Sequence, residues 1–154
     1  MARLNMKDYT NAIMIEPPPN AWGLQTVKIG EAGLRPGYPV TQTGETVPSV
    51  VYGATANDVF YGILLDSADV GIDETFANNA VATCMVAGSR GACWSYAKAS
   101  VGNLHVGTRM HQDADTPGRF LVVNEAMLYE NAGLVIEYSA TSASDRPIKI
   151  ALTG

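Results

Sequence analysis

The sequence predicts a mainly β protein, a small antiparallel β-barrel or sandwich with an extended N-terminal arm and at most one short helix. Three observations favour this class: many short runs of β-branched and apolar residues, closely spaced Gly and Pro turns, and no β-α-β alternation. The 154 residues suit a single domain with its own core. We divide them into an arm at residues 1–22 and one barrel domain at residues 23–154, and we recognise no internal repeat.

Residues 1–22 lack a clear hydrophobic period and contain three consecutive prolines, Pro17 to Pro19. Such a segment favours extended, polyproline-like backbone and disfavours helix. It is either a frayed terminus or an arm that lies on a neighbouring molecule, and we expect the barrel to fold without residues 1–20. The candidate partner contacts are Tyr9, Ile13, Ile15 and Trp22. For Trp22, as for Trp94, packing in the core is the favoured alternative.

Nine short segments are predicted as strands, because each is rich in β-forming residues and bounded by turn residues. They are Leu24–Ile29, Tyr38–Thr41, Pro48–Tyr52, Val59–Leu65, Ala80–Ala87, Ala92–Ala97, Phe120–Val123, Leu134–Tyr138 and Ile148–Leu152. The tetrapeptide Gly88–Gly91 predicts a hairpin between two of them. A helical turn or two is expected between Asn124 and Gly133.

Alternation in the last two strands predicts which side chains share a face. In one strand Ile148, Ile150 and Leu152 share the inward face. In the other, alternation places Leu134, Ile136 and Tyr138 on one face.

Charge and hydropathy exclude two classes of partner. The net charge is −5 and no run of Lys or Arg occurs, so nucleic-acid binding is not expected. No apolar stretch is long enough to span a membrane, and the N-terminus lacks the apolar core of a signal peptide, so we expect the protein to start in the cytoplasm of the cell that produces it. Only 16% of residues are charged, which suits a surface partly covered by protein partners.

The two cysteines, Cys84 and Cys93, fit no zinc-ligand spacing. Two buried free thiols are the favoured interpretation, and a cross-strand disulfide on one hairpin is the alternative.

Two acidic segments contain residue types that can bind a metal. His111 with Asp113 and Asp115 is favoured as a solvated loop over a metal site. The cluster from Asp66 to Glu74 lacks the spacing of a calcium loop, and we interpret it as a polar connection between strands. No nucleophile or phosphate-loop motif is found. The sequence therefore predicts no catalytic, cofactor-binding or metal-binding residues, no cofactor and no enzyme activity.

The order of features resembles the capsid decoration, or cement, proteins of tailed bacteriophages and related viruses. Four segments carry the resemblance: EAGLRPGYPV (Glu31 to Val40), Val50 to Asp69 around YGILLD, Val81 to Met110 and Gly133 to Gly154. It covers residues 30–154, and the stretch Asn124 to Ala132 departs from it by being longer and more apolar.

The resemblance implies a small β-barrel, often of β-tulip type, without cofactor or active site. It implies a virion protein that binds the major capsid protein on the outer capsid surface, stabilises the shell and forms a homotrimer. Another virion part, such as a head-fibre base or tail-tube component, is an alternative. A carbohydrate-binding β module is disfavoured, because only 8% of residues are aromatic and they are scattered.

Overall fold

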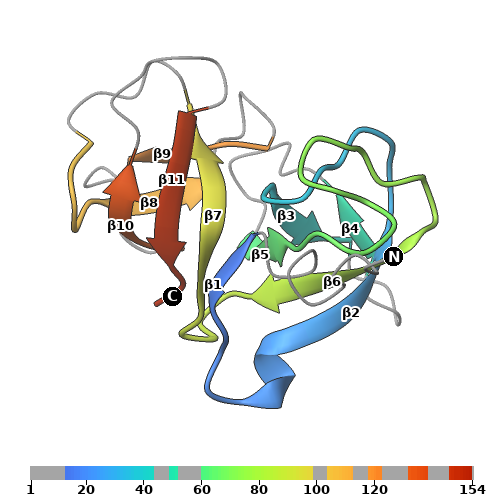
Figure 1. Cartoon of the computed structure of the whole chain (residues 1–154), viewed down its shortest axis with the longest axis horizontal. Helices are drawn as coiled ribbons and strands as arrows, with labels where there is room; N and C mark the ends of the chain where they lie inside the picture. Colours follow the sequence, from blue (N-terminus) through green and yellow to red (C-terminus); the bar gives the residue numbers. More distant parts are fainter. Residues whose placement is uncertain are drawn as a thin grey trace, which may run out of the picture.

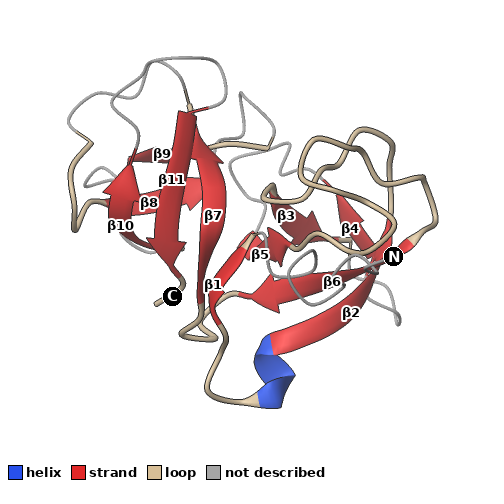
Figure 2. Ribbon diagram, viewed as in Figure 1, coloured by secondary structure: helices blue, strands red, loops and turns tan. Residues whose placement is uncertain are grey.

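The computed structural model describes residues 13–43, 49–51, 60–98, 104–112, 118–122, 132–138 and 146–153. This part of the chain is mainly β, as predicted, and it forms two strand assemblies side by side (Figure 1). Its one helical element is a single 3-10 turn, η1 (Ala21–Gly23), which precedes β2 (Figure 2). The strands are β1 (Met14–Glu16), β2 (Leu24–Ile29), β3 (Pro39–Gln42), β4 (Ser49–Val51), β5 (Phe60–Leu64), β6 (Val81–Val86), β7 (Ala92–Ala97), β8 (Arg109–Gln112), β9 (Phe120–Val122), β10 (Gly133–Tyr138) and β11 (Arg146–Ala151).

The first assembly is a closed five-stranded barrel in the order β2-β4-β3-β5-β6. It is mixed, because β2 and β4 run parallel while its other pairs are antiparallel. The second assembly is a sheet in the order β1-β7-β11-β10-β8-β9. A parallel contact between β7 and β9, at Ala97 and Phe120, joins the last strand of this order to the second one.

The two assemblies are structural repeats of each other, which the sequence analysis did not predict. Strands β2 to β6 correspond in order to β7 to β11. The parallel pair β2–β4 matches β7–β9, and the antiparallel pairs β2–β6, β3–β4, β3–β5 and β5–β6 match β7–β11, β8–β9, β8–β10 and β10–β11. The chain therefore contains the same five-strand topology twice in succession.

Main-chain hydrogen bonds repeat with the strands. The Gly37 N–H donates to the Leu64 carbonyl at 2.7 Å, and the Gly107 N–H donates to the Val135 carbonyl at 2.7 Å. Both glycines have φ of +91°, a conformation that residues with a Cβ rarely adopt. In the sequence, Leu104, Gly107 and Gln112 repeat the spacing of Leu34, Gly37 and Gln42. This short pattern is the signal by which the repeat could have been found.

The core confirms one predicted face and corrects the other. Ile148, Ile150 and Leu152 are fully buried, as the alternation predicted. In β10 it is Val135 that is fully buried, while Ile136 is 42% exposed. The pairing of β10 with β11 shifts register after Val135, and this irregularity breaks the simple alternation on which the prediction depended.

Two further predictions need correction. A turn does lie at Gly88–Gly91, but β6 and β7 do not form a hairpin, because β6 pairs with β2 and β5 while β7 pairs with β11, β1 and β9. The turn instead connects the first barrel to the second sheet (Figure 1). His111 was assigned to a solvated loop, yet it lies in β8 and is only 8% exposed. The predicted helical turn at 124–132 falls outside the described residues, apart from Ala132.

The two assemblies share apolar contacts. One cluster of buried side chains lies within the first barrel. The other fills the second sheet and also includes Ile63, Leu65 and Met85 from the first barrel, together with Ile13 from the N-terminal segment. The second sheet is therefore packed directly against the first barrel.

Candidate protein-contact surface

The structure separates the four predicted contact residues. Tyr9 lies outside the described residues. Ile13 is only 4% exposed and belongs to the core cluster of the second sheet. Ile15 is 39% exposed and Trp22 is 57% exposed. Among the two tryptophans, core packing was the favoured interpretation, and for Trp22 it is wrong.

Strand β1 ties the N-terminal segment to both halves of the molecule. The Ile13 N–H donates to Asp66 Oδ1, just after β5, at 3.1 Å, and the Trp94 N–H of β7 donates to the Ile13 carbonyl at 2.8 Å. Met14 and Glu16 then pair antiparallel with the start of β7. This end of the predicted arm is thus built into the fold.

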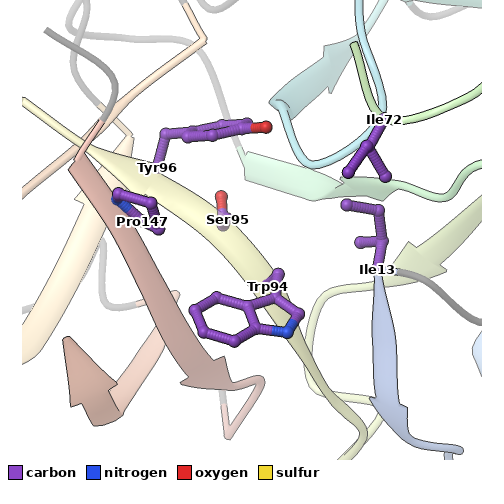
Figure 3. A pocket seen from close by; sticks show the side chains of 6 residues that line it. All are labelled: Ile13, Ile72, Trp94, Ser95, Tyr96 and Pro147. Atoms are coloured by element: carbon purple, nitrogen blue, oxygen red, sulfur yellow. The ribbon is translucent and has the colours of Figure 1, made fainter. Parts of the chain in front are cut away.

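A mainly apolar groove of about 280 Å³ lies where β1, β7, β11 and the β5–β6 connection meet (Figure 3). The Ser95 hydroxyl, which lies in this lining, donates a 2.6 Å hydrogen bond to the Gly37 carbonyl, so its proton is already used within the fold. The lining residues are Ile13, Ile72, Trp94, Ser95, Tyr96 and Pro147. Of these, Ile72 is 43% exposed and gives the groove an apolar rim.

The two aromatic side chains that line the groove, Trp94 and Tyr96, are held by further contacts within the fold. Tyr96 meets Tyr38 edge to face, with ring centroids 5.9 Å apart. The Arg119 guanidinium lies 5.3 Å from the Tyr96 ring centroid and 5.0 Å from that of Tyr38. Lys149 Nζ lies 4.9 Å from the Trp94 ring centroid, within cation–π range. These contacts fix the rings in place, which lowers the entropy lost when a partner binds against them.

Sequence reasoning found only part of this groove. The sequence singles out Ile13 as a contact candidate and Trp94 as large enough to be an anchor, and both line the groove. Ile72 and Pro147 carried no signal, since they come from loops and strands far apart in the chain. Only the fold brings them next to Trp94.

The acidic residues that the sequence offers as metal ligands have different surroundings in the structure. No group of three or more His, Cys, Asp or Glu side chains that could hold a metal is found within the described ranges. The acidic cluster is dispersed: Asp66 is buried and accepts the Ile13 N–H, whereas Asp73 is exposed and pairs with Arg35 at 3.6 Å. Asp113 and Asp115, the proposed companions of His111, fall outside the described residues.

The thiols of Cys84 and Cys93 are free and fully buried, as favoured from the sequence. Burial raises the pKa of both thiols, and the nearby Cys93 raises the pKa of Cys84 further. Both groups are therefore protonated at neutral pH. A thiol needs its ionised form to act as a nucleophile, so neither suits that role.

The buried thiols predict a loss of stability in alkaline solution. The unfolded chain ionises its thiols above their ordinary pKa of 9.0, whereas the folded chain keeps them protonated. The unfolded state then binds fewer protons, so the free energy of unfolding falls as pH rises above about 9, by up to about 1.4 kcal/mol per pH unit for each thiol. Urea unfolding at pH 8 and pH 10 measures this fall. A Cys84→Ala/Cys93→Ala variant should show a smaller fall, and an equal fall would contradict the prediction.

Within the part of the chain that the structure describes, no helix has the length and apolar character needed to cross a membrane. No protein-family model and no curated protein sequence matches this chain.

Proposed function

We propose that this protein is a structural, non-enzymatic component of a virion that binds the outer surface of a capsid and stabilises the shell. Its partners in this role are the major capsid protein and further copies of itself, in a homotrimer. The observation that carries the proposal is the combination of a small mainly β fold with large apolar side chains left on its surface. The order of sequence features shared with capsid decoration proteins supports the same role.

The N-terminal side of the molecule supplies the best contact residues. Trp22 is more than half exposed in η1, and Ile15 is exposed in β1, on the other side of the three prolines. An aromatic side chain of this size gains much from being covered, and tryptophan is enriched among the residues that dominate binding energy. The proline segment between the two residues restricts the backbone, so less entropy is lost on binding.

Undecorated capsid shells provide the direct test of this role. Purified protein is expected to cosediment with them at a saturable ratio. Trp22→Ala is expected to weaken this binding by about tenfold or more, the effect typical of a dominant aromatic contact. Val106 is 63% exposed, similar to Trp22, but lies beside β10 in the second sheet. Val106→Ala is therefore the matched control and should change the affinity less than about twofold.

Two results would count against the proposal. Binding that never saturates, or none at all, would remove the capsid role. Saturable binding that Trp22→Ala and Val106→Ala weaken equally would keep the role but move the contact away from the N-terminal side. Far-UV circular dichroism of each variant ensures that only folded proteins are compared.

A further inference from the structure

Two aromatic side chains follow each other along one strand in the lining of the apolar groove. Trp94 and Tyr96 are two residues apart on β7, so they point to the same face of the sheet, and both are partly exposed. Because a strand advances about 3.3 Å per residue, the two side chains begin about 6.6 Å apart. Pro147 lies opposite Tyr96 on β11 and lines the groove beside it. The groove therefore offers two aromatic surfaces in a row (Figure 3).

The polar groups of the groove favour a ligand that accepts hydrogen bonds. The Trp94 indole nitrogen lies on the edge of the ring turned toward Ile13 (Figure 3), and its N–H has no acceptor among the described residues. Ser95 is buried, and its proton is used by the Gly37 carbonyl. Consecutive prolines fit such a lining, because they present carbonyl acceptors and apolar rings but no N–H groups. An ordinary extended segment would bring N–H groups that lose water without gaining an acceptor.

The protein itself exposes a segment of this chemistry, the three prolines between β1 and η1. Pro17 and Pro19 are exposed, whereas Pro18 is half-buried and lies against Gly23. Consecutive prolines favour the polyproline II helix, which has three residues per turn, a rise of about 3.1 Å per residue and no internal hydrogen bonds. With one edge of this helix against Gly23, the other two edges face outward. Pro17 and Pro19 are then about 6 Å apart along the segment, close to the spacing of the two aromatic side chains.

The prolines and the groove lie at opposite ends of β7, so one copy of the chain does not bring its own prolines into its own groove. Glu16 pairs with Ala92 at the start of β7, and the chain then continues past that end toward η1 (Figure 1). Tyr96 and Pro147 lie toward the other end of the strand. Contact between the two surfaces therefore joins one copy to the next, head to tail. Contacts of this kind close into a ring when the rotation between copies allows it.

We propose that the groove binds the Pro17–Pro19 segment of a second copy of this chain. The two outward prolines pack on the rings of Trp94 and Tyr96, and a carbonyl of the segment accepts the Trp94 indole N–H. Aromatic-lined grooves suit such segments, because the polyproline helix is already formed and loses little entropy on binding. The inference rests on the self-association in the proposed function and names the contact that holds the copies together. It makes no use of the capsid, so the two can be tested apart.

Sedimentation velocity of the free protein measures self-association in the absence of capsids. Pro17→Ala/Pro19→Ala is expected to weaken self-association by about tenfold or more, because it removes both outward rings. Pro18→Ala changes the proline that faces Gly23 and is the matched control, expected to associate within about twofold of the original protein. Trp94→Phe keeps an aromatic ring but removes the N–H, and is expected to weaken self-association by about threefold or more.

Mixing two variants tests the head-to-tail arrangement. Ile72→Glu places a charge on the exposed rim of the groove and leaves the prolines intact, whereas Pro17→Ala/Pro19→Ala leaves the groove intact. Each variant alone is expected to be monomeric, and their mixture to form a one-to-one dimer through the single contact that remains.

Three results would overturn the proposal: an original protein that is monomeric at all concentrations, folded proline variants that associate like the original, or a mixture that forms no dimer. A monomeric protein that binds the peptide NAIMIEPPPN, residues 11–20, would overturn it as well, because the occupant would then belong to a partner protein. Saturable capsid binding by a protein with any of these results would leave the capsid role standing and remove only this contact.

Discussion

Ile13→Ala is expected to lower the free energy of unfolding by about 3 kcal/mol, a loss typical of removing a large aliphatic side chain from a core. Ile13 is 4% exposed and packs in the cluster that fills the second sheet. Ile15, two residues later in β1, is 39% exposed and makes the natural comparison. Ile15→Ala should change stability by less than about 1 kcal/mol, since little of its surface is removed from water on folding. Urea unfolding of the two variants measures the difference.

The effect of Ile13→Ala on stability tests whether the protein needs its N-terminal segment in order to fold. From the sequence we expected the chain to fold without residues 1–20. The structure instead places β1 on β7 and Ile13 in the core, so that truncation would remove buried apolar surface and expose the edge of β7. Equal, small effects of Ile13→Ala and Ile15→Ala would show that the segment is dispensable, as first expected.

Gly133→Ala is expected to destabilise the protein by about 3 kcal/mol or more, because its new Cβ would overlap the Ala151 carbonyl of the neighbouring strand. The obstacle is backbone of a paired strand, which can move only by breaking the ladder. Gly62 occupies the matching place in the first barrel, where a Cβ would overlap the Met85 carbonyl. Gly62→Ala should therefore have a similar effect. Thermal unfolding followed by circular dichroism measures both.

Gly107→Ala separates this steric effect from the cost of an unusual backbone. Gly107 has φ of +91°, and a Cβ there would meet no atom within 4 Å. Only the conformational cost remains, which is about 1–2 kcal/mol. If Gly107→Ala were as damaging as Gly133→Ala, close strand approach would not be the reason for the glycine in β10.

The strands that could be predicted are those with an apolar pattern of their own. The bounds of β2 and β7 agree with the predicted bounds, since both segments are bounded by turn residues and rich in β-forming residues. Strand β8 was missed because its sequence, RMHQ, is mostly polar and only its place against β9 and β10 buries it. Strand β1 was missed for a similar reason: its partner β7 lies far away in the chain, and no local pattern reveals that contact.

The candidate contact surface was predicted in part. Large apolar residues near the N-terminus were singled out, and Trp22 and Ile15 are indeed exposed, but the burial of Ile13 depends on Asp66 and Trp94 and could not be predicted locally. The repeat of the five-strand topology was not predicted, because the sequence similarity of the two halves is limited to a few positions.

The side chains of Ile63, Leu65 and Met85 come from the first five-strand unit but complete the interior of the second. The second unit therefore has no complete apolar interior of its own. Unfolding of the first unit would withdraw these side chains from the second, so we expect the two units to unfold together as one cooperative body.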